Sequence, residues 1–162
     1  MNGYPERKSP RADFHDYCGG TYFVTLCTRE MKCYFGHIKN AEMFLTEIGM
    51  ICEQKIAELA TAYDYLEIPQ YVVMPNHVHL IAYIDYDKYF EKTGREPKRS
   101  ILSFVIGNLK RDVTMYARMH YIDFGWQKRF HDHIIRGSFD GNNISRYIDN
   151  NVAAWETDCF YQ

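Results

Sequence analysis

The sequence has no long apolar run. Its longest apolar stretches, Tyr71–Met74 and Leu80–Ile84, are only a few residues long, whereas a membrane-spanning helix needs about 20 consecutive apolar residues. The first sixteen residues are polar and have no apolar segment like that of a secretion signal. We therefore expect a soluble, cytoplasmic protein with no membrane partner.

Cysteine is sparse and scattered. The five cysteines are odd in number and form no Cys-x-x-Cys pair, whereas zinc sites and disulfide frameworks show paired or clustered cysteines. Cysteines in apolar surroundings behave as small hydrophobic residues. The pattern argues against a cysteine-based metal site, a disulfide framework or a catalytic thiol at Cys18, Cys27, Cys33, Cys52 and Cys159.

Linkers, internal repeats and low-complexity tracts are also lacking. With 162 residues, 46% of them hydrophobic, the chain is long enough to bury a core of its own. We expect a single domain over residues 1–162, preceded within that range by a polar N-terminal extension at 1–18.

The net charge of −2 does not by itself suggest a nucleic-acid partner, but the charges are unevenly distributed. Between Lys88 and Arg136 there are 11 Lys and Arg against 5 Asp and Glu, and the rest of the chain has 8 against 16. Such an asymmetry can give an acidic molecule one basic face that attracts phosphates. Ordinary solvated charge explains the composition equally well.

Hydrophobic periodicity predicts three helices and four strands. Charge, Gly94 and Pro97 predict a loop at 85–99, and Ser100 can cap the helix that follows it. A Pro-Asn turn at 75–76 joins two strands as a hairpin. The order fits an α+β, ferredoxin-like split β-α-β fold, with helices packed on one face of an antiparallel sheet. The expected strands are 21–28, 65–74, 77–84 and 128–135, and the expected helices are 41–60, 100–118 and 140–152.

Two histidines, His77 and His79, are spaced as strand neighbours on one face. Imidazoles so placed can converge on one divalent metal, and two protein ligands leave positions open for substrate oxygens. The alternative is a pair of half-buried histidines that are hydrogen-bonded to the backbone.

In the last predicted helix, Tyr147 and Asn151 are four residues apart and share a face. Asn151 can offer a carbonyl oxygen to a metal, and Tyr147 a phenolic oxygen to an electrophile. Because Ile144 and Ile148 adjoin the same face, core packing is the competing interpretation.

A second histidine pair, His131 and His133, also has strand spacing. A metal site there is possible on spacing alone. A phosphate-binding or structural role is equally consistent, because Arg129 and Arg136 flank the pair.

Five segments, in order and suitably spaced over about Gly19 to Trp155, resemble the single-tyrosine HUH transposases, and in particular their REP-associated branch. The segment that contains His77 and His79 is similar to the HUH motif of that family. The matching segments are 20–25, 71–81, 126–130, 132–136 and 147–151.

The resemblance implies a ferredoxin-like fold and metal-dependent cleavage and joining of single-stranded DNA near a hairpin or repeat. By position, His77, His79 and Asn151 match the family's ligands for Mg²⁺ or Mn²⁺, and Tyr147 matches its nucleophile, which forms a 5′-phosphotyrosine intermediate. Val152 stands where the family usually has proline, and His131 where an aromatic is common.

Single-stranded or hairpin DNA is the expected partner, and the resemblance implies a homodimer. One alternative function is a catalytically silent hairpin-DNA-binding protein derived from a transposase. Another is a metal-dependent hydrolase of small phosphoesters. The residues expected to contact DNA phosphates are Lys110, Arg111, Arg118, Lys128, Arg129 and Arg136.

Overall fold

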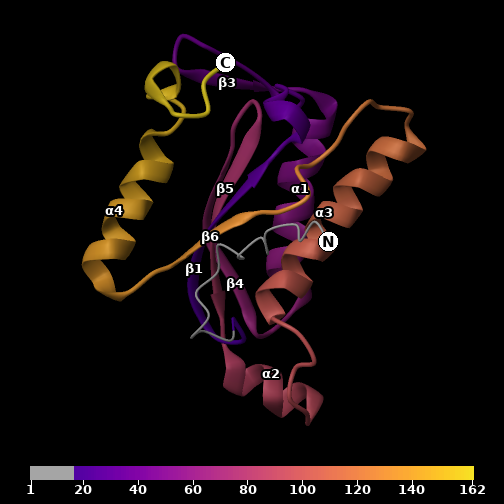
Figure 1. Cartoon of the computed structure of the whole chain (residues 1–162), viewed down its shortest axis with the longest axis vertical. Coiled ribbons are helices and arrows are strands. Elements are labelled where there is room, and N and C mark those ends of the chain that lie inside the picture. Colours follow the sequence, from indigo (N-terminus) through magenta and orange to yellow (C-terminus); the bar gives the residue numbers. More distant parts are fainter. Residues whose placement is uncertain (1–16) are drawn as a thin grey trace, which may run out of the picture.

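A four-stranded antiparallel sheet forms the centre of the computed structural model, which describes residues 17–162 (Figure 1). The strand order is β4-β5-β1-β6, so β1 and β5, the strand that carries His77 and His79, lie in the middle. Every pairing is antiparallel, as the sequence predicts. The strands are β1 Gly20–Cys27, β4 Leu66–Val73, β5 His77–Ile84 and β6 His131–Ile134.

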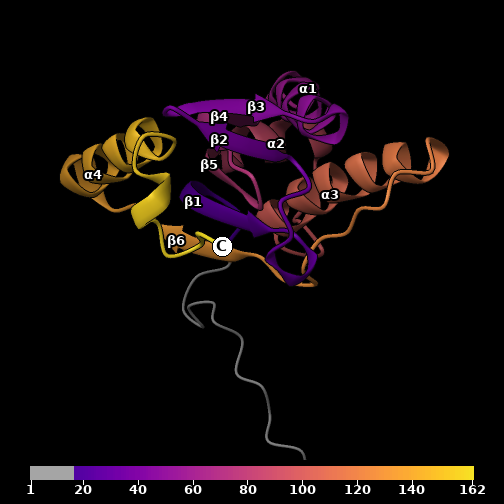
Figure 2. The same cartoon turned by 90° about the horizontal axis from the view of Figure 1, so that it is seen from above.

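The two faces of the sheet carry different helices. Helices α1 (Glu47–Ala62) and α3 (Ile101–Met119) pack together on one face, and α4 (Gly137–Asn150) lies against the other (Figures 1 and 2). The expected α+β fold with an antiparallel sheet is confirmed. The expectation that the helices pack on one face holds for α1 and α3 and is wrong for α4, which the sheet separates from them.

Side chains along each strand point alternately to the two faces of the sheet, so the apolar core and the candidate site lie on opposite faces. In β1, Tyr22, Val24 and Leu26 are fully or almost fully buried and belong to the apolar cluster that packs beneath α1 and α3. Side chains one residue away point to the opposite face. That face, on the α4 side, carries His77 and His79.

A short hairpin that the sequence analysis missed precedes α1. Strands β2 (Gly36–Lys39) and β3 (Glu42–Leu45) pair antiparallel. Asn40 and Ala41 join them with φ values of 53° and 58°, as a two-residue turn of the type that suits hairpins requires. Helix α1 starts only at Glu47, because Thr46 caps it by accepting a hydrogen bond from the Gly49 N–H.

The predicted loop at 85–99 is wrong in its first half, which forms α2 (Tyr86–Thr93). Asp85 caps the start by accepting from the Lys88 N–H, and Gly94 ends the helix in the left-handed conformation at φ 65°. Both capping signals are in the sequence, but the high charge of the segment outweighed them in the prediction.

Two short 3-10 turns, η1 (Arg29–Met31) and η2 (Trp155–Thr157), complete the described structure. Tyr17 and Cys18, at the end of the predicted N-terminal extension, are buried in the core, and the rest of that extension, residues 1–16, lies outside the described residues. Over residues 17–162, none of the helices has the length and apolar character needed to cross a membrane.

Candidate functional site

The histidine pair on β5 is buried beneath α4 and the C-terminal segment. His77 is 0% and His79 1% exposed, and their ring centroids lie 4.5 Å apart. The structure therefore brings the two predicted ligands together on one face of a central strand, as the spacing indicated.

Hydrogen bonds fix the orientation of both rings. Nδ1 of His77 lies 2.8 Å from Oδ1 of Asn76, which as a carbonyl oxygen can only accept, so Nδ1 carries the proton. Asn76 is held in turn by its amide, which donates to the Phe160 carbonyl at 2.8 Å. Nδ1 of His79 is hydrogen-bonded at 2.8 Å to the Thr25 hydroxyl on β1. In each ring Nε2 is left as the atom that faces the site.

Two acceptor atoms in this site have no hydrogen-bond partner within the described residues. Nε2 of His77 and Oδ1 of Asn151 are both buried and unpaired, which in an apolar environment costs about 1–3 kcal/mol per group. Asn151 is itself 1% exposed, and its amide donates to Oδ2 of Asp158 at 2.9 Å. Two oriented acceptors beside a second imidazole fit a divalent cation, because imidazole and carbonyl oxygen are both metal ligands.

Burial keeps the histidines neutral. It lowers the pKa of His77 to about 4, although Asp158 and Asn151 raise it somewhat. Burial, reinforced by the neighbouring His77, lowers the pKa of His79 to about 3. Both imidazoles are therefore neutral near pH 7, as metal ligation requires.

Tyr147, on α4, places its hydroxyl beside the histidine pair. Its hydroxyl lies 3.3 Å from Nε2 of His79 and donates to Oδ2 of Asp158 at 3.2 Å. Its side chain remains 40% exposed. Burial, with a further contribution from Asp158, raises the pKa of Tyr147 to about 12, so the phenol is protonated near neutral pH.

Asp158 is a site residue that the sequence analysis missed. Its Oδ2 accepts from both Tyr147 and Asn151, and its Oδ1 accepts from the Phe160 N–H at 2.8 Å. Burial raises the pKa of Asp158, but these hydrogen bonds outweigh it and hold the pKa below its usual value. No spacing relates Asp158 to the histidines, so only the folding back of the C-terminal segment reveals it.

The C-terminal segment also covers the histidines. The ring of Phe160 lies 4.5 Å from that of His77 and 5.9 Å from that of His79, and Trp155 lies 6.1 Å from His77. A phosphate can reach the imidazole nitrogens only if part of this segment moves.

Contacts with the sheet place α4. Gln70 on β4 donates to the Ser145 carbonyl at 3.1 Å and to Asp149 at 2.7 Å. Phe23 on β1 stacks on His79 at 5.0 Å and meets Tyr147 edge-on at 6.1 Å. These contacts fix the helix rotation that points Tyr147 and Asn151 at the histidines.

The second histidine pair does not form a comparable site. His133 pairs with Asp140 at 2.9 Å, and Asp140 also accepts from the Arg136 N–H at the start of α4. His131 is exposed. Within the described part of the chain, no three side chains of His, Cys, Asp or Glu are grouped as a metal site, so the candidate set depends on the amide of Asn151.

The six predicted DNA-contacting residues fall into two groups. Four of them line a groove of about 540 Å³ beside α3, together with Arg29, Phe124 and Trp126. We call this the basic groove. Arg129 and Arg136 lie outside its lining. The four predicted residues in it are Lys110, Arg111, Arg118 and Lys128.

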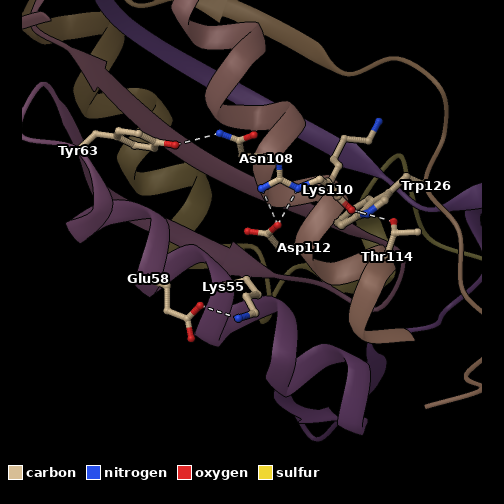
Figure 3. Close-up of polar contacts among 9 residues, drawn as sticks. Lys55, Glu58, Tyr63, Asn108, Lys110, Asp112, Thr114 and Trp126 are labelled. Atoms are coloured by element: carbon tan, nitrogen blue, oxygen red, sulfur yellow. Dashed lines mark hydrogen bonds and ion pairs between the residues drawn. The ribbon is translucent and has the colours of Figure 1, made fainter. Parts of the chain in front are cut away.

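Lys110 has a structural task within the basic groove. Its ammonium donates to the Gln127 carbonyl at 2.7 Å. Its own carbonyl accepts from the indole of Trp126 at 3.2 Å (Figure 3). Since the Gln127 N–H donates to the Cys27 carbonyl at the end of β1, these bonds attach the groove to the end of the sheet where β5 begins with His77.

Comparison with solved structures first gives the fold. The chain is similar in fold to a REP-associated tyrosine transposase solved bound to a REP hairpin, with a TM-score of 0.58, 22% identity, and coverage of 94% of this chain and 73% of that one. The family resemblance predicted from the motifs is thus confirmed at the level of fold. No family model matches the sequence.

A relationship in sequence links the chain to an uncharacterized protein of Haemophilus influenzae. The two are 30% identical over 171 residues, which cover 98% of this chain and 95% of that protein. The chain belongs to the family of that protein.

Proposed function

We propose that the protein is a metal-dependent enzyme that cleaves single-stranded DNA next to a hairpin or repeat and transfers the strand, with Tyr147 as the nucleophile. The observation that carries the proposal is the convergence of Tyr147, His79 and Asn151 around a buried, unpaired histidine nitrogen. The transposase fold supports it independently.

Nε2 of His77, Nε2 of His79 and Oδ1 of Asn151 would hold the cation, Mg²⁺ or Mn²⁺. When bound, such a cation supplies polarisation of the scissile phosphate and stabilisation of the leaving oxygen. Asn76 and Thr25 keep both rings in the orientation that this role needs.

The covalent step uses the Tyr147 hydroxyl. Its oxygen attacks phosphorus, the bond from phosphorus to the 3′ oxygen breaks, and a 5′-phosphotyrosine forms as the phenol proton is lost and the 3′ oxygen gains one. A 3′-hydroxyl then reverses the reaction and joins the strands. The phosphodiester energy is retained in the covalent link, so no nucleotide cofactor is required.

Asp158 positions the reacting groups in this scheme. By accepting from the Asn151 amide it turns the carbonyl oxygen of Asn151 inward, and by accepting from Tyr147 it holds the hydroxyl beside His79. Removal of Asp158 should therefore disturb both the nucleophile and a ligand.

Hairpin DNA is the proposed partner of the basic groove. Arginine and lysine side chains lining one groove attract phosphates whatever the sequence, and the solved neighbour is described as bound to a REP hairpin. Arg129 and Arg136 stay as proposed contacts outside the groove.

One chain supplies the whole candidate site. Tyr147 contacts His79 of its own chain, which supports catalysis in cis. The homodimer implied by the family resemblance stays a prediction, and sedimentation of the protein with and without DNA tests it.

A non-enzymatic hairpin-binding protein is the second candidate. It is favoured by the complete burial of His77 and His79 beneath the C-terminal segment. Cleavage separates the two functions.

The test is incubation of labelled hairpin DNA, taken from beside the gene, with wild type and with His77→Gln, in Mn²⁺, Mg²⁺ and chelator. We expect metal-dependent cleavage by wild type and none by the variant. Tight binding without cleavage under any of these conditions would favour the DNA-binding protein.

A further inference from the structure

A second groove lies between α2 and α3, at the end of the sheet opposite the candidate site. It has a volume of about 640 Å³, and we call it the α2–α3 groove. Tyr65 on its wall precedes Leu66, which pairs with Ile84 at the end of β5, whereas His77 begins β5. An eight-residue strand spans about 25 Å at ~3.3 Å per residue, so the two sites are well separated.

One wall of the α2–α3 groove is aromatic. The rings of Tyr63 and Tyr65 stack at 5.2 Å, and Tyr89 meets Tyr65 edge-on at 5.1 Å. Phe104 lies 6.0 Å from Tyr63 and is 41% exposed, so ring surface is open to a ligand. Asn108 donates to the Tyr63 hydroxyl at 2.9 Å and fixes that ring (Figure 3).

The rim of the groove is cationic. Arg95, Lys98 and Arg99 line it and are exposed, and no ion pair is found for them among residues 17–162. The carboxylate on the rim, Glu96, accepts a hydrogen bond from Tyr86. Three cations beside an aromatic wall suit a ligand that carries both phosphate and a flat ring.

Gly107, on the α3 side, has no role in the fold that explains it. A glycine inside a helix is destabilising relative to alanine. A Cβ added there would meet no neighbouring atom within 4 Å, and the φ of Gly107 is not in the left-handed region. Neither packing nor backbone geometry requires glycine at this position, which instead leaves the groove open.

We propose that the α2–α3 groove binds an unpaired nucleotide of the DNA substrate, with the base against the aromatic wall and its phosphate on the cationic rim. The inference rests on the proposed function, which supplies DNA as the substrate. Aromatic rings stack on any base, and a basic groove follows the backbone. A separation of about 25 Å corresponds to roughly seven steps of ~3.4 Å along a duplex, so unpaired nucleotides beyond a short stem reach the groove.

Binding of a fluorescent single-stranded octanucleotide to the full chain, followed by anisotropy, tests the proposal. Gly107→Leu fills the groove and should raise the Kd about tenfold, the effect of losing one stacked base. Lys98→Ala should weaken binding, while Lys88→Ala, an exposed lysine of α2 outside the groove, should not. Wild-type affinity in both Gly107→Leu and Lys98→Ala would overturn the proposal.

Gly107→Ala controls for folding. Because alanine favours helix and the space is open, its Tm should equal or exceed that of wild type. The Tm of Gly107→Leu is compared with that of Gly107→Ala by thermal unfolding. Lys98 lies outside α3, so the effect of Lys98→Ala on binding does not depend on the stability of that helix.

Two further measurements separate this proposal from the proposed function. At saturating DNA, Gly107→Leu should still form the Tyr147 adduct. Oligonucleotide binding that is sensitive to Gly107→Leu, in a protein that forms no adduct with any DNA, would uphold the groove and defeat the proposed function. Competition by a free deoxynucleoside monophosphate as strong as that by the oligonucleotide would mean a small-nucleotide site and overturn the DNA assignment.

Discussion

Single atoms determine what the candidate site can bind. On His77, Nδ1 is hydrogen-bonded to Asn76 and Nε2 is buried without a hydrogen-bond partner. On Asn151, the amide nitrogen donates to Asp158 and the carbonyl oxygen is buried without a hydrogen-bond partner. A buried acceptor without a donor is unfavourable unless something positive completes it. The neighbours that orient these groups are therefore as important as the groups themselves.

Asn76→Ala removes the acceptor that holds Nδ1 of His77. Loss of such an outer partner typically costs 10–100-fold in metal affinity, and we expect a fall of about that size for Mn²⁺ by calorimetry. Asn142→Ala, an exposed position on α4, is the control and should bind Mn²⁺ as wild type does. Equal affinities in both variants would contradict the assigned role of Asn76.

Stability should fall in mild acid. The pKa of His77 is lowered to about 4 and that of His79 to about 3, against about 6.5 in an unfolded chain. Between pH 6.5 and 4 the unfolded state binds more protons, so the free energy of unfolding rises with pH. Stability present above pH 6.5 is thus lost as the pH falls, by up to about 1.4 kcal/mol per pH unit for each histidine.

Urea unfolding of the metal-free protein from pH 4 to 7.5 measures this dependence. His77→Gln should have a shallower slope than wild type, because one of the two titrating rings is gone. An equal slope in the two proteins would show that His77 does not titrate as its burial implies.

The sequence predicted the residue types at the centre of the site and missed the groups around them. His77 and His79 follow from strand spacing, and Tyr147 and Asn151 from helical spacing, because both periods are local. Asp158 and Phe160 reach the site through a turn after α4 that has no periodic signal, and their importance depends on where the chain folds back.

At the level of elements, the C-terminal segment and α4 act together. Helix α4 brings Tyr147 to the histidines, and the segment after it supplies Asp158 and covers the rings with Phe160. Substrate access and site geometry therefore depend on one short stretch of chain.

Phe160→Ala should uncover the histidines. We expect the initial rate of DNA cleavage to rise several-fold, because the imidazole nitrogens become accessible while Asp158 is retained. Glu156→Ala, an exposed change in the same segment, should leave the rate as it is. A slower rate in Phe160→Ala with an unchanged Tm would show that the ring orders the site rather than blocking it.

Element boundaries were predictable where local chemistry and burial agreed. Alternating residues identified the β4–β5 hairpin, whose Pro-Asn turn is also clear. The predicted start of helix α1 at residue 41 is too early, because Phe44 on β3 falls at helical spacing from Ile48. Only the Thr46 cap separates the strand from the helix.

Across the whole molecule, four basic side chains from the segment with excess positive charge, residues 88–136, line one groove. An acidic chain of net charge −2 carries a basic groove along α3 at the same end of the sheet as His77. In the proposed function, this groove would attract DNA phosphates toward the end of the sheet that carries the candidate site.

Hairpin binding should weaken steeply with salt. Each phosphate contact contributes about −0.9 to the slope of log K against log salt, so Arg118→Ala should reduce the slope by about one such contact. Lys55 lies on α1, outside the basic groove, and pairs with Glu58. Lys55→Ala should therefore leave the slope unchanged. Fluorescence titrations between low and physiological salt give both slopes, and identical slopes for Arg118→Ala and wild type would remove Arg118 from the interface.

The central claim is that Tyr147 becomes covalently linked to DNA, and one measurement addresses it directly. Wild type, Tyr147→Phe and Tyr161→Phe are incubated with hairpin DNA and Mn²⁺, denatured, digested and analysed by mass spectrometry. We predict a nucleotide joined through its 5′-phosphate to the Tyr147 peptide in wild type and in Tyr161→Phe. This adduct should not form in the presence of chelator or in Tyr147→Phe. An adduct that persists in Tyr147→Phe, or cleavage with no adduct in any of the proteins, would contradict the account.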